Sequence, residues 1–115
     1  MATILVVDDE APIREFLALL LEDLGHEVRL AINGRQAVEL ASSKRPDLVI
    51  SDVMMPIMGG PEFCTWVKRE LHPPPPVILT SSAGRHLAAN SPADAFIDKP
   101  FDIEEIEELV RRCLE

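Results

Sequence analysis

The chain has few cysteines, and the two it has form no motif. Cys64 and Cys113 are far apart among 115 residues and lack the spacing of metal ligands. We therefore predict neither a disulfide framework nor a structural metal, and we interpret both residues as small apolar side chains of a reduced, cytoplasmic protein. A chain of this length can bury a core of its own, so we expect a single domain over residues 1–115.

Basic residues and long apolar runs are also scarce. Eleven Lys and Arg against twenty Asp and Glu give a formal charge of −9, and such a surface repels a phosphate backbone. We therefore expect no direct binding to nucleic acid. The apolar runs are far too short for a bilayer span, and no basic region followed by a long apolar stretch opens the chain. We expect neither membrane insertion nor secretion, whereas clustered carboxylates would permit cation binding.

Five short segments have the character of strands. The first, third and fourth contain continuous apolar runs, which are typical of strands buried on both faces of a parallel sheet. The predicted strands are Ile4 to Val7, Glu27 to Ala31, Asp47 to Asp52, Val77 to Thr80, and Ala95 to Ile97.

Helical patterns separate these strands. Apolar residues at three- and four-residue spacing, with Pro, Gly or Asp at the ends, predict the helices. They are Pro12 to Leu24 with Gly25 ending it, Gly34 to Lys44, Gly60 to Leu71, a brief or irregular helix over Ala83 to Asn90, and a last helix that begins after Asp102. Strictly alternating strands and helices, joined by right-handed crossovers, predict an α/β fold with a doubly wound five-stranded parallel sheet and helices on both faces.

Polar side chains gather at the predicted carboxyl ends of the strands, where open parallel sheets bind ligands. Several carboxylates brought to one edge repel one another unless a cation neutralises them, and oxygen ligands select a hard cation such as Mg²⁺. Taken singly, each of these residues has a structural explanation: an acidic turn, a strand end before a proline turn, or a solvated lysine. The residues are Asp8 and Asp9 after strand one, Asp52 after strand three, Thr80 and Ser81 after strand four, and Lys99 after strand five.

Four motifs at these strand ends resemble one family along nearly the whole chain. They are V-V-D-D-E, S-D-V-M-M-P-I-M-G-G, V-I-L-T-S-S-A and F-I-D-K-P-F, in that order. Together they closely resemble the receiver domain of two-component response regulators. The resemblance implies a flavodoxin-like fold with strand order 2-1-3-4-5, cytoplasmic phosphorelay signalling, and Mg²⁺ as cofactor.

The resemblance also implies roles for individual residues. Asp52 would be the phosphoacceptor, and Lys99 would contact the phosphoryl group. The metal ligands would be Asp8, Asp9, Asp52 and the backbone carbonyl of Met54. Pro100 matches the family's cis peptide.

Two roles stay open between neighbours or explanations. Counting from Pro76, the family's switch hydroxyl falls on Ser81, although Thr80 looks more like the usual threonine; we favour Ser81 and keep Thr80 as the alternative. Phe96 stands where the family has its switch aromatic, but an aromatic in an apolar strand is equally explained as core.

The resemblance predicts a signalling protein that is not an enzyme beyond its own phosphorylation and dephosphorylation. Its partners would be a sensor histidine kinase or phosphotransfer protein, and a downstream target or a fused output domain. One alternative is a receiver-like binding module that is never phosphorylated. The other, an aspartyl phosphohydrolase, needs a second acid two residues after the nucleophile, where this chain has Met54.

Overall fold

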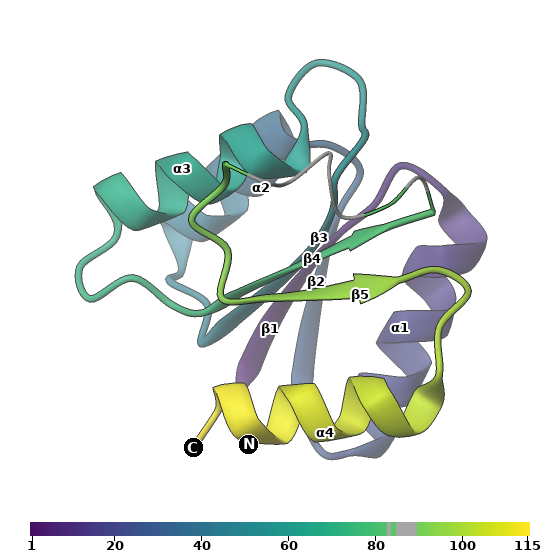
Figure 1. Ribbon diagram of the computed structural model, residues 1–115. Helices are drawn as coiled ribbons and strands as arrows, with labels where there is room; N and C mark the ends of the chain where they lie inside the picture. Colours follow the sequence, from purple (N-terminus) through teal and green to yellow (C-terminus); the bar gives the residue numbers. More distant parts are fainter. Residues whose placement is uncertain (83, 85–89) are drawn as a thin grey trace.

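A five-stranded parallel sheet runs through the centre of the molecule (Figure 1). The computed structural model describes residues 1–82, 84 and 90–115. The strands lie in the order β2-β1-β3-β4-β5, and neighbouring strands pair in parallel. They are β1 (Thr3–Val7), β2 (Glu27–Ala31), β3 (Leu48–Asp52), β4 (Val77–Ser81) and β5 (Ala95–Asp98). The predicted fold class and strand order are confirmed.

Four helices connect or follow the strands within the described residues. They are α1 (Ala11–Asp23), α2 (Gly34–Ser43), α3 (Gly60–Glu70) and α4 (Ile103–Cys113). The first three begin and end within one residue of their predicted positions, and α4 begins directly after Asp102, as predicted. The brief helix predicted over residues 83–90 falls on a segment that lies largely outside the described residues. No helix in the described part of the chain combines the length and apolar composition of a membrane span.

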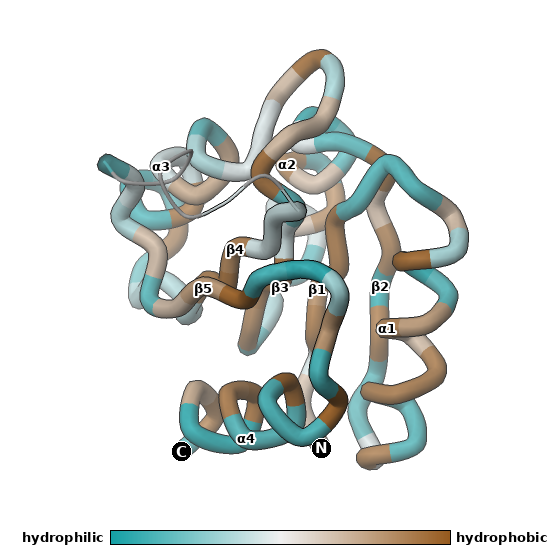
Figure 2. The backbone as a smooth tube through the Cα atoms, turned by 45° about the vertical axis from the view of Figure 1, so that its right-hand side comes forward, coloured by the Kyte–Doolittle hydropathy of each residue, from teal (hydrophilic) through white to brown (hydrophobic). Residues whose placement is uncertain are grey.

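Helices α2 and α3 cover one face of the sheet, and α1 and α4 cover the other (Figure 1). Alternate residues of β1 face opposite layers, so Leu5 and Val7 pack with α2 and α3, while Ile4 and Val6 pack with α1 and α4. Figure 2 shows the colour along β5 changing from hydrophobic to hydrophilic toward its carboxyl end. The sheet is therefore apolar where helices cover it and polar at one edge.

Helix ends follow the local sequence signals with one small shift. Gly25 ends α1 with a φ of 95°, a conformation that glycine adopts without strain. The Asp102 carboxylate caps α4 and accepts hydrogen bonds from the backbone N–H groups of Glu104 (2.9 Å) and Glu105 (3.4 Å). This cap, three residues beyond Lys99, fixes the start of α4 at Ile103. Pro12 lies at the second position of α1 instead of the predicted first, which removes no helical hydrogen bond.

Candidate functional site

Four strands bring polar residues to one edge of the sheet. Asp52 is the last residue of β3, and its register partner on β4 is Thr80, with Ser81 one residue further. Asp8 follows β1 directly, and Lys99 follows β5. Because parallel strands share direction, their carboxyl ends meet here, as the sequence predicts. The backbone N–H of Lys99 donates to the Ser81 carbonyl (2.9 Å), which ties the end of β5 to β4.

The Lys99 ammonium lies among three carboxylates. Its Nζ is 3.0 Å from Asp8 Oδ2, 3.4 Å from Asp52 Oδ1 and 3.7 Å from Glu10 Oε1. The side chains of Asp8, Asp52 and Lys99 are almost fully buried, whereas that of Glu10 is 64% exposed. The peptide between Lys99 and Pro100 is cis, as the resemblance implies. The structure therefore joins residues 91 positions apart in the chain into one charged cluster.

Charges within this cluster control the pKa of Lys99. Burial lowers the pKa of the ammonium, but the hydrogen bond and charge of Asp8, together with those of Asp52, outweigh burial and raise the pKa overall. Lys99 therefore stays cationic across the physiological range and supplies a fixed positive charge at the strand ends.

The surroundings of Asp52 disfavour its charged form, whereas those of Lys99 favour the charged form. Burial, followed by the nearby charge of Asp8, raises its pKa from 3.8 to about 6, although Lys99 and the Val53 backbone N–H (3.0 Å from Oδ1) oppose the shift. The positive charge of Lys99 therefore compensates only part of the negative charge on Asp52 and Asp8. A divalent cation beside it would favour the ionised, nucleophilic form.

The turn after β1 gathers three carboxylates. One ligand oxygen each from Asp8, Asp9 and Glu10 lies within 4.8 Å of the other two. Backbone contacts hold this turn: the Glu10 N–H donates to Asp8 Oδ1 (2.9 Å), and the Arg14 guanidinium donates to the Asp8 carbonyl (2.7 Å). Asp8 is buried, while Asp9 and Glu10 are exposed.

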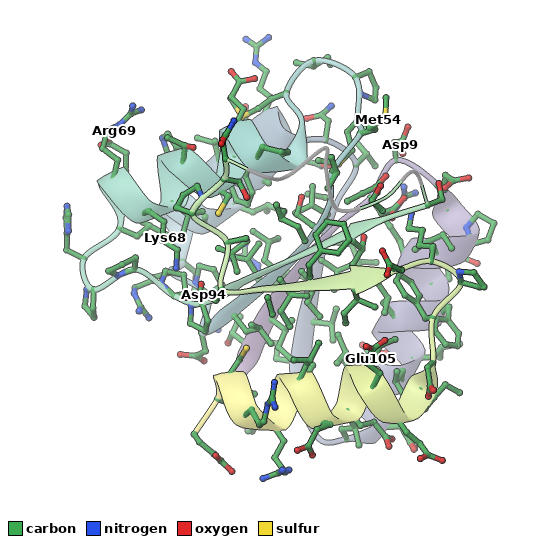
Figure 3. All side chains as sticks on the ribbon, viewed as in Figure 1. Asp9, Met54, Lys68, Arg69, Asp94 and Glu105 are labelled. Atoms are coloured by element: carbon green, nitrogen blue, oxygen red, sulfur yellow. The ribbon has the colours of Figure 1, made fainter. Side chains whose placement is uncertain are left out.

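The chemistry of these groups fits a hard divalent cation. The donors are carboxylate oxygens, and the burial of Asp8 and Asp52 leaves negative charge that only Lys99 offsets among the described residues. Asp9 and Met54 lie on loops at this edge, whereas Asp94 precedes β5 at the opposite edge (Figure 3). The predicted ligands Asp8, Asp9, Asp52 and Met54 are thus on neighbouring segments, and their binding of Mg²⁺ stays a prediction.

Comparison with known proteins identifies the family. The model of the response regulator receiver domain matches residues 4–111. The chain belongs to this family. Receiver domains are signalling modules of two-component systems, and the resemblance inferred from the four motifs is confirmed.

Relatives of this receiver domain include longer proteins. The response regulator MprA of Mycolicibacterium vanbaalenii is 40% identical over 114 residues, which are 96% of this chain and 49% of MprA. Histidine kinase P4 of Formosa agariphila is 37% identical over 119 residues, which cover 99% of this chain and 9% of the kinase. The receiver domain thus spans about half of one curated relative and a small part of the other.

Solved structures agree with the fold. The signal receiver domain of a signal transduction histidine kinase from Syntrophus aciditrophicus has a TM-score of 0.91 at 37% identity, covering 99% of this chain and 90% of that chain. The response regulator TrrA of Thermotoga maritima, solved in complex with Mg²⁺ and BeF, has a TM-score of 0.91 at 34% identity, covering 99% of this chain and all of TrrA.

Both candidate switch hydroxyls of the receiver domain are buried at the end of β4. Thr80 is the register partner of Asp52, and Ser81 is the partner of Asp98, the residue before Lys99. Ser81 is the one nearer the edge and carries the carbonyl that binds the Lys99 backbone. The assignment of Ser81, with Thr80 as alternative, stays a prediction.

Phe96 has the environment of a half-buried core residue. It pairs in register with Leu79 and packs against the core layer beneath α2 and α3. Its predicted role as a switch aromatic remains a prediction, because a half-buried ring is compatible with both of the explanations that the sequence left open.

Several supports of the site were missed at the level of sequence. Glu10 joins both the acidic turn and the Lys99 cluster, and Arg14 braces that turn from the first part of α1. Gly60, the first residue of α3, approaches the Asp52 backbone so closely that an added Cβ would overlap the Asp52 carbonyl oxygen. Glu10 was available from the sequence as the third acid of the run, whereas the roles of Arg14 and Gly60 depend on tertiary contacts.

Proposed function

We propose that Asp52 of this receiver domain accepts a phosphoryl group from a phosphohistidine donor in a Mg²⁺-dependent reaction. The observation that carries the proposal is the buried Asp52 carboxylate, held 3.4 Å from the Lys99 ammonium and close to the charge of Asp8. In the transfer, an Asp52 oxygen forms a bond to phosphorus while the bond from phosphorus to the donor's imidazole nitrogen breaks.

The chain's own residues would prepare this reaction. The Val53 backbone N–H donates to Asp52 Oδ1 at 3.0 Å and so orients the carboxylate. Lys99, kept cationic by its neighbours, would stabilise negative charge that arrives on the phosphoryl oxygens. Asp8, Asp9, Asp52 and the Met54 carbonyl would hold Mg²⁺, which would neutralise negative charge during the transfer.

The proposed consequence is a switch of an interaction surface. An aspartyl phosphate adds charge at the strand ends, and a hydroxyl donor at Ser81 would bind it only after transfer. The phosphoryl donor would be a sensor histidine kinase or a phosphotransfer protein, and the receiver of the signal a downstream protein or an output domain in a longer polypeptide. Relatives called response regulator and histidine kinase, both longer than this chain, support that placement.

Phosphorylation of Asp52 is the first test. Incubation with acetyl phosphate and Mg²⁺ should add one phosphoryl mass to the intact protein, and EDTA should abolish the gain. Asp52→Asn should show no gain, while Asp23→Asn, the same change at an exposed residue of α1, should behave as wild type. An equal gain in Asp52→Asn would refute the phosphoacceptor assignment, and no gain in wild type would favour an unphosphorylated binding module.

Replacement of the switch hydroxyl should uncouple the signal from the chemistry. Ser81→Ala should accept the phosphoryl group at a near-normal rate but lose most of the amide shift changes that beryllofluoride induces in wild type, because the hydroxyl acts only after transfer. Amide spectra with and without beryllofluoride measure this, and Thr80→Ala is the matched control. If Thr80→Ala is the variant that loses the response, Thr80 is the switch residue.

A further inference from the structure

Glu10 differs from the other carboxylates around Lys99 in its freedom to move. Its Oε1 is the most distant of the three from the Lys99 ammonium, at 3.7 Å, and its side chain is the only one of the three that is mostly exposed. Its backbone is fixed, since its N–H donates to Asp8 Oδ1 and its carbonyl accepts from the N–H groups of Ile13 and Arg14. The carboxylate can therefore change partner by rotating its side chain alone.

The Glu10 carboxylate also lies next to the oxygens that would bind a divalent cation. A Glu10 oxygen lies within 4.8 Å of one oxygen each from Asp8 and Asp9. These two aspartates are among the residues that we propose to hold the cation. Glu10 thus stands between an ammonium already present and the group of oxygens that a divalent cation would occupy. When Glu10 neutralises the ammonium, it attracts the cation less strongly. When Glu10 binds the cation, it attracts the ammonium less strongly.

We propose that Glu10 is a positioning residue shared between Lys99 and the divalent cation. Without the cation, Glu10 helps Asp8 and Asp52 hold the ammonium. When the cation binds, Glu10 turns toward it and leaves the ammonium to the Asp52 side of the cluster. The inference rests on the proposed function, because it concerns the cation that would serve phosphoryl transfer, but it assigns a role to a residue outside the predicted ligand set.

A double-mutant cycle on Mg²⁺ affinity tests the sharing. Titration calorimetry on the metal-free 115-residue protein would compare wild type, Glu10→Gln, Lys99→Met and the double variant. Glu10→Gln should weaken Mg²⁺ binding by roughly threefold when Lys99 is present, because part of the carboxylate's charge is committed to the ammonium. In the Lys99→Met background the same change should weaken binding by roughly tenfold, since Glu10 is then fully available to the cation.

Glu15→Gln is the matched control for net charge. It makes the same chemical change at an exposed residue of α1 that lies outside the group of Asp8, Asp9 and Glu10. Its effect on Mg²⁺ affinity should be less than about twofold in either background, because exposed charges at longer range are screened by solvent and salt. Thermal unfolding of every protein in the cycle and of both Glu15→Gln proteins would establish that they are folded at the titration temperature.

Three results would overturn the inference. They are a Glu15→Gln effect as large as that of Glu10→Gln, a Glu10→Gln effect no larger in the Lys99→Met background than with Lys99, and no Mg²⁺ binding by wild type. Acetyl phosphate labelling of the same wild-type sample separates this inference from the proposed function. Mg²⁺ binding that follows the predicted cycle without any phosphorylation would support the role of Glu10 and refute phosphoryl transfer.

Discussion

Gly60→Ala should destabilise the receiver domain by about 3 kcal/mol, at the upper end of the usual range for overpacking a core. The added Cβ would overlap the Asp52 carbonyl oxygen and lie 3.0 Å from the Asp52 carbonyl carbon and 3.1 Å from Leu79 Cδ2. Two of these three atoms belong to backbone, which cannot rotate away as a side chain can. The Gly60 N–H also donates to the Val53 carbonyl (2.9 Å), so α3 cannot move off β3 without breaking this bond.

Urea unfolding followed by circular dichroism would measure the loss of stability. Glu62→Ala, an exposed change in the same turn of α3, is the control and should alter stability by less than about 0.5 kcal/mol. The displaced Asp52 backbone should also slow acetyl phosphate labelling in Gly60→Ala protein that is still folded. If Gly60→Ala is as stable as Glu62→Ala, the start of α3 can shift to accommodate the added Cβ, contrary to this prediction.

Asp52→Asn should stabilise the protein at neutral pH by about 2 kcal/mol while abolishing its proposed chemistry. Burial and the charge of Asp8 raise the folded-state pKa of Asp52 to about 6, against 3.8 for the ordinary group. Each pKa unit corresponds to about 1.36 kcal/mol, so the charge of Asp52 costs the folded protein at most about 3 kcal/mol at neutral pH, a value that already includes the attraction of Lys99. An asparagine keeps the shape of the side chain without its charge.

The sign of the effect predicts a distinct pH profile. Between pH 4 and 6 the unfolded chain loses the Asp52 proton before the folded chain does, so wild type becomes progressively less stable relative to Asp52→Asn. Below about pH 4 the two proteins should be equally stable, and above about pH 7 the difference should be constant. Urea unfolding in EDTA from pH 4 to 8 measures it, with exposed Asp23→Asn as control. If the difference in unfolding free energy between wild type and Asp52→Asn does not vary with pH, the raised pKa of Asp52 is not its cause.

Mg²⁺ should reduce the advantage of the asparagine variant. A cation bound beside Asp52 neutralises the charge that burial penalises, and it stabilises the folded wild type by binding to it preferentially. The stability gap between wild type and Asp52→Asn at pH 7 should therefore narrow when Mg²⁺ replaces EDTA, while the Asp23→Asn gap should not change.

Periodicity was sufficient to predict the strands, the helices and a doubly wound parallel sheet, whereas the strand order followed from the resemblance to receiver domains. The apolar runs in β1, β3 and β4 are buried, and the common direction of all the strands brings Asp8, Asp52 and Lys99 together as expected. These predictions succeeded because a parallel sheet converts order along the chain into position along one edge.

Contacts between side chains of different elements were harder to predict. The ion pair between Glu10 and Lys99 depends on the rotamers of both side chains. The close approach of Gly60 to Asp52 depends on how α3 packs against β3. The choice between Thr80 and Ser81 depends on which hydroxyl moves when Asp52 is phosphorylated. Neither the sequence pattern nor a structure of one conformation shows that movement.

The separation of 91 residues between the two ends of the Lys99–Asp8 ion pair has a consequence for synthesis of the chain. The ribosome delivers the acidic turn and Asp52 long before β5 and Lys99. Until β5 pairs with β4, the nascent chain carries the Asp52 carboxylate without the Lys99 ammonium beside it. If Asp52 accepts phosphoryl groups with the help of Lys99, as we propose, labelling should begin only when β5 has joined the sheet, and incompletely synthesised chains should take up no phosphoryl group.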